Sequence, residues 1–314
     1  MEKNFEEDAP GKINATLNNI PLFPVPKGEV WLGTDLLKQA GFTDSLENHF
    51  SMADRLGQEM VCLPVTDNTI SKPSLGYRYF ECADLKKAVQ IGGRFIAAVV
   101  DGPFQELVNS MGLMNVLMGW ARDRSQIIKA YEKEQTRILD LISQCLDMGV
   151  QGIILTDDLA ADQGPMISPK DIEMLCTRFY RESVNNIHNA GLPVFLHSCG
   201  KIKQLTKLIR SWQIDGLAAV QHSINNLPEL RDLMGPNHVI MAGIDAPLLA
   251  TELSEEMVLE FTDMLKAMTP GGCFILSSSC GLYSGDFLDR IKKIYTLADH
   301  VTPLHSDQPG VRHI

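Results

Sequence analysis

The chain has 314 residues, of which 45% are hydrophobic and 21% are charged. This length is long for one ordinary domain but normal for an α/β barrel, and the composition excludes a largely disordered chain. Acidic residues outnumber basic ones by 39 to 28, and the formal net charge is -11. A nucleic-acid-binding protein needs a basic face to neutralise phosphates, so we expect no nucleic-acid partner.

The first eight residues are acidic and contain no apolar core segment, so no signal peptide is expected. The longest apolar runs, such as residues 95–100, have the length of a strand and are too short to span a bilayer. The 7 cysteines are scattered along a chain with no secretory signal, which argues against disulfides. These features predict a cytoplasmic protein that does not cross a membrane.

Residues 1–27 show little periodicity and contain Pro21, Pro24 and Pro26, so we interpret them as an N-terminal extension laid over the main domain. Short apolar runs then alternate with amphipathic segments. Strands are expected at 29–33, 60–65, 94–100, 151–156, 193–196, 215–220, 238–243 and 272–277. Helices are expected at 35–41, 45–56, 83–90, 104–120, 123–148, 169–190, 201–212, 227–234, 255–268 and 284–298.

Serines precede three of the expected helices, and we interpret Ser45, Ser168 and Ser254 as their N-caps. Strands that alternate with helices indicate parallel pairing, and near-continuous apolar strands indicate burial on both faces. The predicted fold is therefore α/β, a single-domain (βα)8 TIM barrel over residues 28–301 with a polar tail at 302–314. An open doubly wound sheet is the structural alternative, although no G-x-G-x-x-G follows a strand.

Polar side chains recur where the apolar strands end, and in a barrel this is where functional residues lie. The candidates in chain order are Asp101, Asp157, Asp158, His197, Cys199, Gln221, His222, Asp245 and Cys280. Several also have a structural interpretation: Asp101 as a turn residue, and Asp157 and Asp158 as solvated loop acids or partners of a helix N-terminus. His222 could hydrogen-bond within its loop. Their recurrence at successive strand ends favours a functional site at the barrel mouth.

Two of these strand ends carry soft metal ligands followed by glycine. His197, Cys199 and Gly200 follow one apolar strand, and Cys280 and Gly281 follow another. Zn²⁺ accepts imidazole and thiolate, and a catalytic zinc site keeps three protein ligands and one open position. If the two strand ends face one cavity, His197, Cys199 and Cys280 form such a site, and the occupant of the fourth position stays open.

These motifs resemble those of the uroporphyrinogen decarboxylase superfamily, and within it the zinc-dependent corrinoid methyltransferases. The resemblance covers most of the chain from about Met60 onward. Its carriers are residues 99–104, Asp157-Asp158 with 164–169, residues 197–200, residues 215–217 and residues 279–281. The His-x-Cys-Gly motif with a later Cys-Gly is typical of the methyltransferase branch.

The resemblance implies a zinc-dependent methyltransferase that moves a methyl group between a corrinoid protein and a thiol or similar acceptor, in the manner of the coenzyme M enzymes. Zn²⁺ would be held by His197, Cys199 and Cys280. Methylcobalamin would be supplied in trans, because the chain contains no Asp-x-His-x-x-Gly corrinoid motif. Asp157 and Asp158 are expected to be catalytic. The expected substrate-binding residues are Asp101, Gln221, His222 and Asp245.

Two departures from the superfamily pattern matter. Residues 37–42 resemble the middle of the decarboxylase's N-terminal motif but lack both of its arginines, which argues against tetrapyrrole decarboxylation. Gln221 and His222 stand where some methyltransferase relatives carry an acid near the metal. The alternatives are a decarboxylase of a tetrapyrrole or another acid, and a non-catalytic partner of a corrinoid protein.

Overall fold

The computed structural model describes residues 7–67, 76–279, 281–301 and 312–313 of the chain. Its centre is a parallel sheet of seven strands in the order β10-β9-β8-β7-β4-β3-β2. The strands are β2 (Met60–Val65), β3 (Phe95–Asp101), β4 (Gly152–Thr156), β7 (Val194–His197), β8 (Gly216–Val220), β9 (Val239–Ile244) and β10 (Phe274–Ser278). Every residue of these strands is buried, as expected for a parallel sheet covered on both faces.

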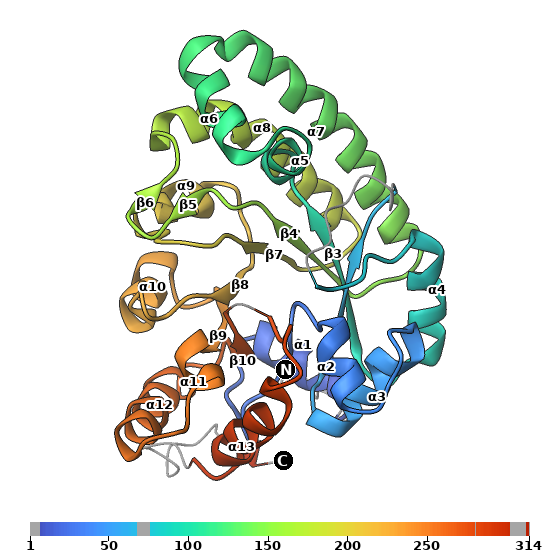
Figure 1. Cartoon of the computed structure of the whole chain (residues 1–314), viewed down its shortest axis with the longest axis vertical. Coiled ribbons are helices and arrows are strands. Elements are labelled where there is room, and N and C mark those ends of the chain that lie inside the picture. Colours follow the sequence, from blue (N-terminus) through green and yellow to red (C-terminus); the bar gives the residue numbers. More distant parts are fainter. Residues whose placement is uncertain (1–6, 68–75, 280, 302–311, 314) are drawn as a thin grey trace, which may run out of the picture.

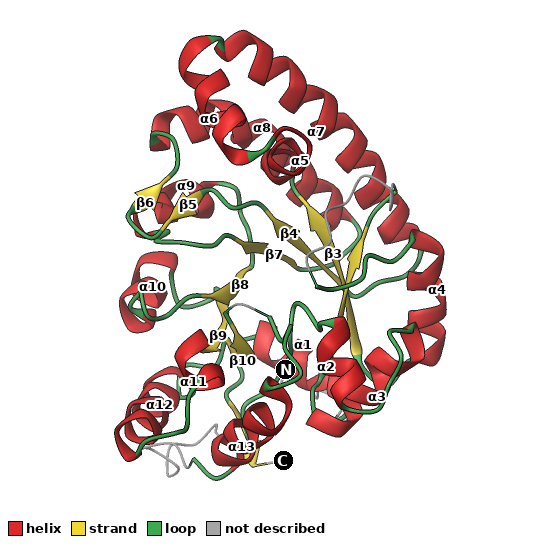
Figure 2. Ribbon diagram, viewed as in Figure 1, coloured by secondary structure: helices red, strands yellow, loops and turns green. Residues whose placement is uncertain are grey.

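The sheet is curled, and most helices surround its outer face (Figure 1). Figure 2 shows the strands in the middle of the molecule and the helices around them. The helices are α1 (Ala9–Leu17), α2 (Thr34–Gln39), α3 (Leu46–Leu56), α4 (Cys82–Ile91), α5 (Pro103–Met111), α6 (Leu113–Arg122), α7 (Arg124–Asp147), α8 (Pro169–Asn189), the 3-10 turn η2 (Lys203–Leu205), α9 (Thr206–Ser211), α10 (Leu227–Met234), α11 (Ala246–Ala250), α12 (Glu255–Met268) and α13 (Phe287–Asp299). The predicted α/β barrel architecture is confirmed.

An irregular segment occupies the place of the eighth strand, between β10 and β2. Lys27 forms an isolated parallel bridge with Leu276 of β10, and its carbonyl accepts a hydrogen bond from Glu59 N at 2.8 Å. The strand predicted at 29–33 is therefore wrong, because this stretch forms only isolated bridges. Pro24 and Pro26 lack backbone donors, which prevents a continuous ladder from starting here.

Helix α1 closes the amino-terminal end of the barrel and was not predicted. Ile13 is fully buried and packs in the barrel interior with Met60, Phe95 and Val239, each the first residue of its strand. The side chain of Asp8 caps the helix by accepting from Gly11 N at 2.8 Å. The low periodicity and the prolines of residues 1–27 predicted no regular element there, and the helix at residues 9–17 corrects that interpretation. The domain boundaries at 27/28 and 301/302 stay a prediction.

The three predicted N-caps are confirmed. Ser45, Ser168 and Ser254 each accept a hydrogen bond from the backbone N–H three residues later. Other boundaries differ from the prediction. Gly112, with φ of 81°, interrupts the helix expected at 104–120 and divides it into α5 and α6.

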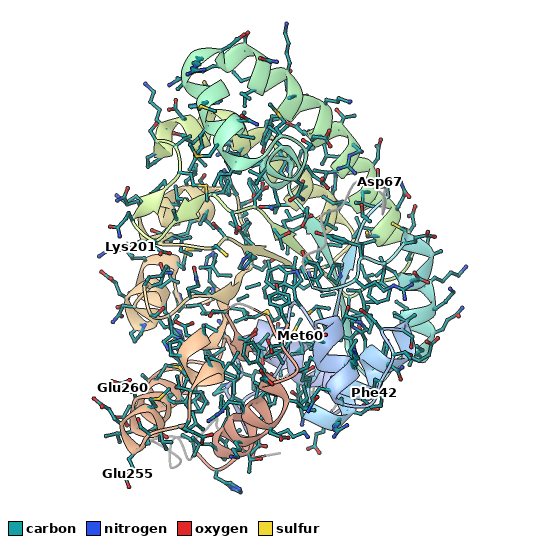
Figure 3. The ribbon with its side chains drawn as sticks, in the orientation of Figure 1. Phe42, Met60, Asp67, Lys201, Glu255 and Glu260 are labelled. Carbon is teal, nitrogen blue, oxygen red and sulfur yellow. The ribbon has the colours of Figure 1, made fainter. Side chains whose placement is uncertain are left out.

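Short elements complete the fold. The loop after β4 contains a hairpin of β5 (Ala160–Ala161) and β6 (Gly164–Pro165), and β1 (Leu22–Phe23) pairs with β11 (Arg312–His313) in the expected tail. Figure 3 shows Glu255 and Glu260 at the outer edge of the molecule and Met60 near its centre. Within the described ranges, no helix is both long enough and apolar enough to cross a membrane.

Candidate metal centre

The candidate centre lies at the carboxyl end of β7, where the chain turns away from the sheet. His197 is the last residue of β7, and Ser198, Cys199 and Gly200 form the turn. Gly200 has φ of 82°, and a Cβ atom there would lie 2.5 Å from the backbone carbon of Ala160. Only glycine tolerates this conformation and this close approach, so the turn that presents Cys199 depends on Gly200.

The ring of His197 is held in one orientation by two contacts. Its Nδ1 atom lies 2.9 Å from the carbonyl oxygen of Ala218 in β8, so Nδ1 carries the proton and donates. The Nε2 atom is then left with its lone pair, which is the form that ligates a metal. Trp31 packs edge-to-face against the ring, with the centroids 4.7 Å apart.

Three potential ligand atoms converge beside this ring. Cys199 Sγ lies 3.5 Å and Asp158 Oδ1 lies 3.6 Å from His197 Nε2, and the three ligand groups lie within 4.8 Å of one another. Ligand atoms of a tetrahedral zinc site are roughly 3.4–3.6 Å apart, given metal–ligand bonds of about 2.0–2.3 Å. The residues therefore fit a zinc ion, and Asp158, His197 and Cys199 are named here the candidate metal centre.

Cys280, the third ligand predicted from the sequence, lies outside the described residues. Ser279, which precedes it in the chain, and Tyr283, three residues after it, both line the cavity into which the centre opens. Asp158 was expected to be catalytic, and the structure places its side chain, about one-third exposed, at the candidate metal centre. Asp158 Oδ1 also accepts a hydrogen bond from Cys199 N at 2.8 Å.

The centre opens into a cavity of about 250 Å³. Its lining also includes a group of residues that we name the acidic aromatic wall: Trp31, Tyr77, Tyr79, Asp101 and Tyr283. Within it, Asp101 accepts hydrogen bonds from the hydroxyls of Tyr79 and Thr156, both at 2.8 Å.

The four aromatic members of this wall were not identified from the sequence. They come from the irregular segment before α2 and from loops after β10 and before α4, none of which has a periodic pattern. The signal available was the pair of tyrosines at Tyr77 and Tyr79, and Tyr283 directly after the strand-end motif.

Asp157 points away from the cavity. Its Oδ1 atom accepts from Gln105 N in the first turn of α5 at 2.8 Å, and its Oδ2 atom accepts from the Tyr180 hydroxyl at 2.8 Å. Burial raises the pKa of Asp157 to about 7, although both hydrogen bonds lower it. A Cβ atom at Gly102 would lie 2.2 Å from Asp157 Oδ2, so this carboxyl fits tightly beneath the start of α5. Asp157 is not among the described residues that line the cavity.

Gln221, His222 and Asp245 lie beside the centre rather than in its cavity. Gln221 Oε1 accepts from Gly200 N at 2.6 Å and so supports the turn that carries Cys199. His222 and Asp245 line a second cavity of about 310 Å³ bounded by α11 and α12. Burial alone would raise the pKa of Asp245, but hydrogen bonds from His222 and Ser223 hold that pKa well below its usual range.

The sequence model described as Uroporphyrinogen decarboxylase (URO-D) matches residues 63–300, well over half of the chain. The chain belongs to the uroporphyrinogen decarboxylase family. The resemblance predicted from the strand-end motifs is confirmed. A search of curated protein sequences finds no match.

Solved structures of similar fold include a methyltransferase and two methionine synthases. A methyltransferase from Methanosarcina mazei has a TM-score of 0.72 and 15% sequence identity, over 94% of this chain and 99% of that one. A putative vitamin-B12 independent methionine synthase from Listeria monocytogenes has a TM-score of 0.56 and 14% identity, over 90% and 99% of the two chains. The corresponding synthase from Shewanella sp. W3-18-1 has a TM-score of 0.57 and 14% identity, over 90% and 96%. At these identities the likeness shows the fold alone.

Proposed function

We propose that this member of the uroporphyrinogen decarboxylase family is a zinc-dependent methyltransferase that moves a methyl group between a corrinoid protein and a thiol or similar acceptor. The observation that carries the proposal is the convergence of His197 Nε2, Cys199 Sγ and Asp158 Oδ1 at one side of a cavity. Imidazole and thiolate select zinc over magnesium or calcium, which prefer oxygen ligands. The similarity in fold to methyltransferases supports the proposal.

A thiol must lose its proton before its sulfur can accept a methyl group, because the thiolate is the nucleophile. A zinc ion at the centre would supply this activation by favouring the deprotonated sulfur. We propose Cys280 as a further ligand beside His197 and Cys199. The carboxylate of Asp158, open to the cavity, is placed to hold the released proton or to complete the ligand set.

Other residues of the site position these groups. The hydrogen bond from His197 Nδ1 to Ala218 O keeps the ligating nitrogen directed at Cys199. Gln221 and Asp158 hold the backbone on either side of the Cys199 thiol by accepting from Gly200 N and Cys199 N. Asp157 supports the site indirectly, since it fixes the start of α5 next to Asp158.

The decarboxylase activity for which the family is named is the alternative. A porphyrinogen presents several carboxylates, and their recognition requires cationic side chains. The cavity presents Asp101 and Asp158, and none of the described residues that line it is Lys or Arg. This balance of charge favours methyl transfer over decarboxylation.

Metal content and activity of matched variants test the proposal. Purified protein should contain about one zinc per chain by mass spectrometry, and His197→Ala and Cys199→Ser should lose most of it. Cys82→Ser removes a half-buried thiol that does not line the cavity and should keep the metal. Equal zinc in Cys199→Ser and Cys82→Ser would contradict the proposed centre.

Methyl transfer is measured with free methylcobalamin and a thiol, following the loss of the methylcobalamin absorbance. The wild type and Cys82→Ser should demethylate the donor, whereas Cys199→Ser should not. Zinc-bearing protein that binds a corrinoid partner and transfers no methyl group would support the non-catalytic alternative. Release of carbon dioxide from uroporphyrinogen would support the decarboxylase.

A further inference from the structure

Helices α4 and α7 bring two cysteines together. The start of α4 packs beside the end of α7 (Figure 1), and there the Sγ atoms of Cys82 and Cys145 lie 3.9 Å apart, although 63 positions separate them in the chain. The sulfurs of a disulfide are about 2 Å apart, so an approach of about 2 Å would join these two. Cys82 is the first residue of α4, where backbone N–H groups have no intrahelical partner, so this end of the helix can adjust.

The two thiols have unequal surroundings. Cys82 is half-buried and follows the N-cap Glu81, so its sulfur lies at the positive end of the α4 dipole, whereas Cys145 is fully buried in the last turn of α7. The Cys145 thiol donates to the Cys82 sulfur. This bond lowers the pKa of Cys82, against burial and the charge of Asp67, and it raises the pKa of Cys145, which burial raises further. Cys82 therefore has the character of an attacking thiolate and Cys145 that of a resolving thiol.

The other described cysteines do not combine an accessible sulfur with a lowered pKa. Cys62, Cys176 and Cys273 are buried, and burial raises the pKa of each thiol. Cys199 belongs to the candidate metal centre, so a bound zinc ion would engage its sulfur. Because oxidation follows thiolate character and exposure, a small oxidant should react first at Cys82.

We propose that Cys82 and Cys145 form a modification site at which a hydroperoxide produces a reversible disulfide. With hydrogen peroxide, the Cys82 sulfur attacks one oxygen, the O–O bond breaks, and Cys82 becomes a sulfenic acid. The leaving hydroxide takes up the proton that Cys82 released and departs as water. The Cys145 sulfur then attacks the Cys82 sulfur, the S–O bond breaks, and the hydroxide leaves with the Cys145 proton as a second water. Two thiols are oxidised to one disulfide while one peroxide is reduced, and none of these steps depends on the proposed function.

The disulfide would tether a segment that lines the cavity. Tyr77 and Tyr79 contribute to the cavity wall, and Phe80 N donates to Pro64 O of β2 at 2.8 Å directly after them. A covalent bond at Cys82 adds a second anchor two residues further on, and this anchor is α7. The oxidised protein should therefore hold the segment at residues 76–81 more rigidly than the reduced protein.

Peptide mapping tests the site. Zinc-loaded protein is treated with hydrogen peroxide, its remaining thiols are alkylated under denaturing conditions, and its disulfides are located by mass spectrometry. Linked peptides of Cys82 and Cys145 are expected, and dithiothreitol should return both residues to free thiols. Full alkylation of Cys145 after the peroxide treatment, or oxidation of Cys82 only to a sulfinic acid, would overturn the inference.

Matched variants separate the two roles. Cys145→Ala leaves the attacking thiol without its partner, so a sulfenic acid should accumulate at Cys82 and be trapped by dimedone. Cys82→Ser should leave Cys145 unoxidised, and Cys176→Ser, which removes another buried thiol, should keep the disulfide. Oxidation of Cys145 in Cys82→Ser at the wild-type rate would contradict the assignment of the attacking thiol. Mapping of the wild type decides the matter by itself if Cys145→Ala does not fold.

Two further measurements report on the tether. Closing the loop between Cys82 and Cys145 should raise the midpoint of thermal unfolding by about 5 °C, and dithiothreitol should reverse the shift. Deuterium exchange at residues 76–81 should slow in the oxidised protein. Cys82→Ser should show neither change after peroxide treatment. An unchanged midpoint and unchanged exchange in protein whose disulfide has been mapped would refute the tether.

Discussion

Asp158 Oδ1 accepts a hydrogen bond from the backbone N–H of Cys199 at 2.8 Å, and the same atom lies 3.6 Å from His197 Nε2. The carboxylate thus fixes the turn that presents the Cys199 thiol and also stands among the candidate ligands. Its neighbour Asp157 faces the opposite way, toward α5 and Tyr180. Two adjacent aspartates therefore serve different parts of the molecule.

This division predicts opposite effects of two similar substitutions. Asp158→Asn should weaken zinc binding by about 10–100-fold, because it removes the charge of a candidate ligand. It should change stability little, because the amide oxygen can still accept from Cys199 N. Asp157→Asn should lower the free energy of unfolding by about 1–3 kcal/mol, because Asn has one acceptor oxygen where the carboxylate uses two. Zinc titration and urea denaturation of both variants check this, and equal zinc affinity in the two would contradict it.

Replacing Gly200 should destabilise the protein by more than the cost of its backbone conformation alone. Gly200→Ala forces a Cβ atom to within 2.5 Å of the Ala160 backbone, whereas Gly41, at a similar φ of 83°, has nothing within 4 Å. Gly41→Ala should therefore lower the free energy of unfolding by about 1–2 kcal/mol. Gly200→Ala should lower it by about 3 kcal/mol or more, and this variant should also lose zinc. Denaturation midpoints measure the difference, and equal losses in the two variants would refute the close contact.

Because of the buried carboxyl of Glu29, we expect the stability of the protein to fall as the pH rises. This carboxyl is buried between β10 and α13, where it accepts from Ser278 N at 3.1 Å and from the Tyr295 hydroxyl at 2.6 Å. Burial raises the pKa of Glu29 from 4.5 to about 7, against these hydrogen bonds. Between these pH values the folded protein keeps a proton that the unfolded chain releases, so the free energy of unfolding decreases with pH.

The slope attributable to Glu29 is roughly 1 kcal/mol per pH unit, present from about pH 4.5 to 7. Glu29→Gln should remove this part of the slope, which denaturation at several pH values measures. Asp289→Asn alters an exposed carboxylate and serves as the control. A slope that is unchanged in Glu29→Gln would show that the carboxyl is charged in the folded state.

For Asp245 we expect the opposite: its contribution to stability should fall as the pH falls. It accepts from His222 N and Ser223 N, which holds the loop after β8. Because the adjacent His222 side chain and hydrogen bonds from Ser223 and Ser279 keep the pKa of Asp245 below the usual range despite burial, its contribution is present above about pH 4 and is lost as the pH falls further. Asp245→Asn should cost about 1–3 kcal/mol at pH 7 and less at pH 3, whereas Glu260→Gln should cost little at either pH. A cost that does not shrink at low pH would argue against the charged form.

The regular elements were predictable because their signals are local. Ser45, Ser168 and Ser254 cap helices as expected, since a serine three residues before a free backbone N–H needs no information from the rest of the chain. The apolar strands were predictable for the same reason. Their parallel order followed from the alternation with helices, and the family resemblance from the motifs at the strand ends.

The site was only partly predictable, because its geometry depends on turns and on distant segments. No sequence pattern distinguishes Asp157 from Asp158 once the strand has ended, since the last turn decides which carboxyl meets Cys199. Trp31 and Tyr283 come together only when the irregular segment passes beside β10, as the hydrogen bond from Leu282 N to Trp31 O at 3.0 Å shows. Such long-range pairing leaves no local signature.

The irregular segment at 26–33 closes the barrel between β10 and β2, and we call it the joint of the barrel. Isolated pairs hold it to both neighbours, so a small local opening breaks few hydrogen bonds. Its amide protons should therefore exchange with deuterium sooner than those of the buried strand β4. Trp31 belongs both to this joint and to the cavity wall, so each opening also moves one side of the cavity.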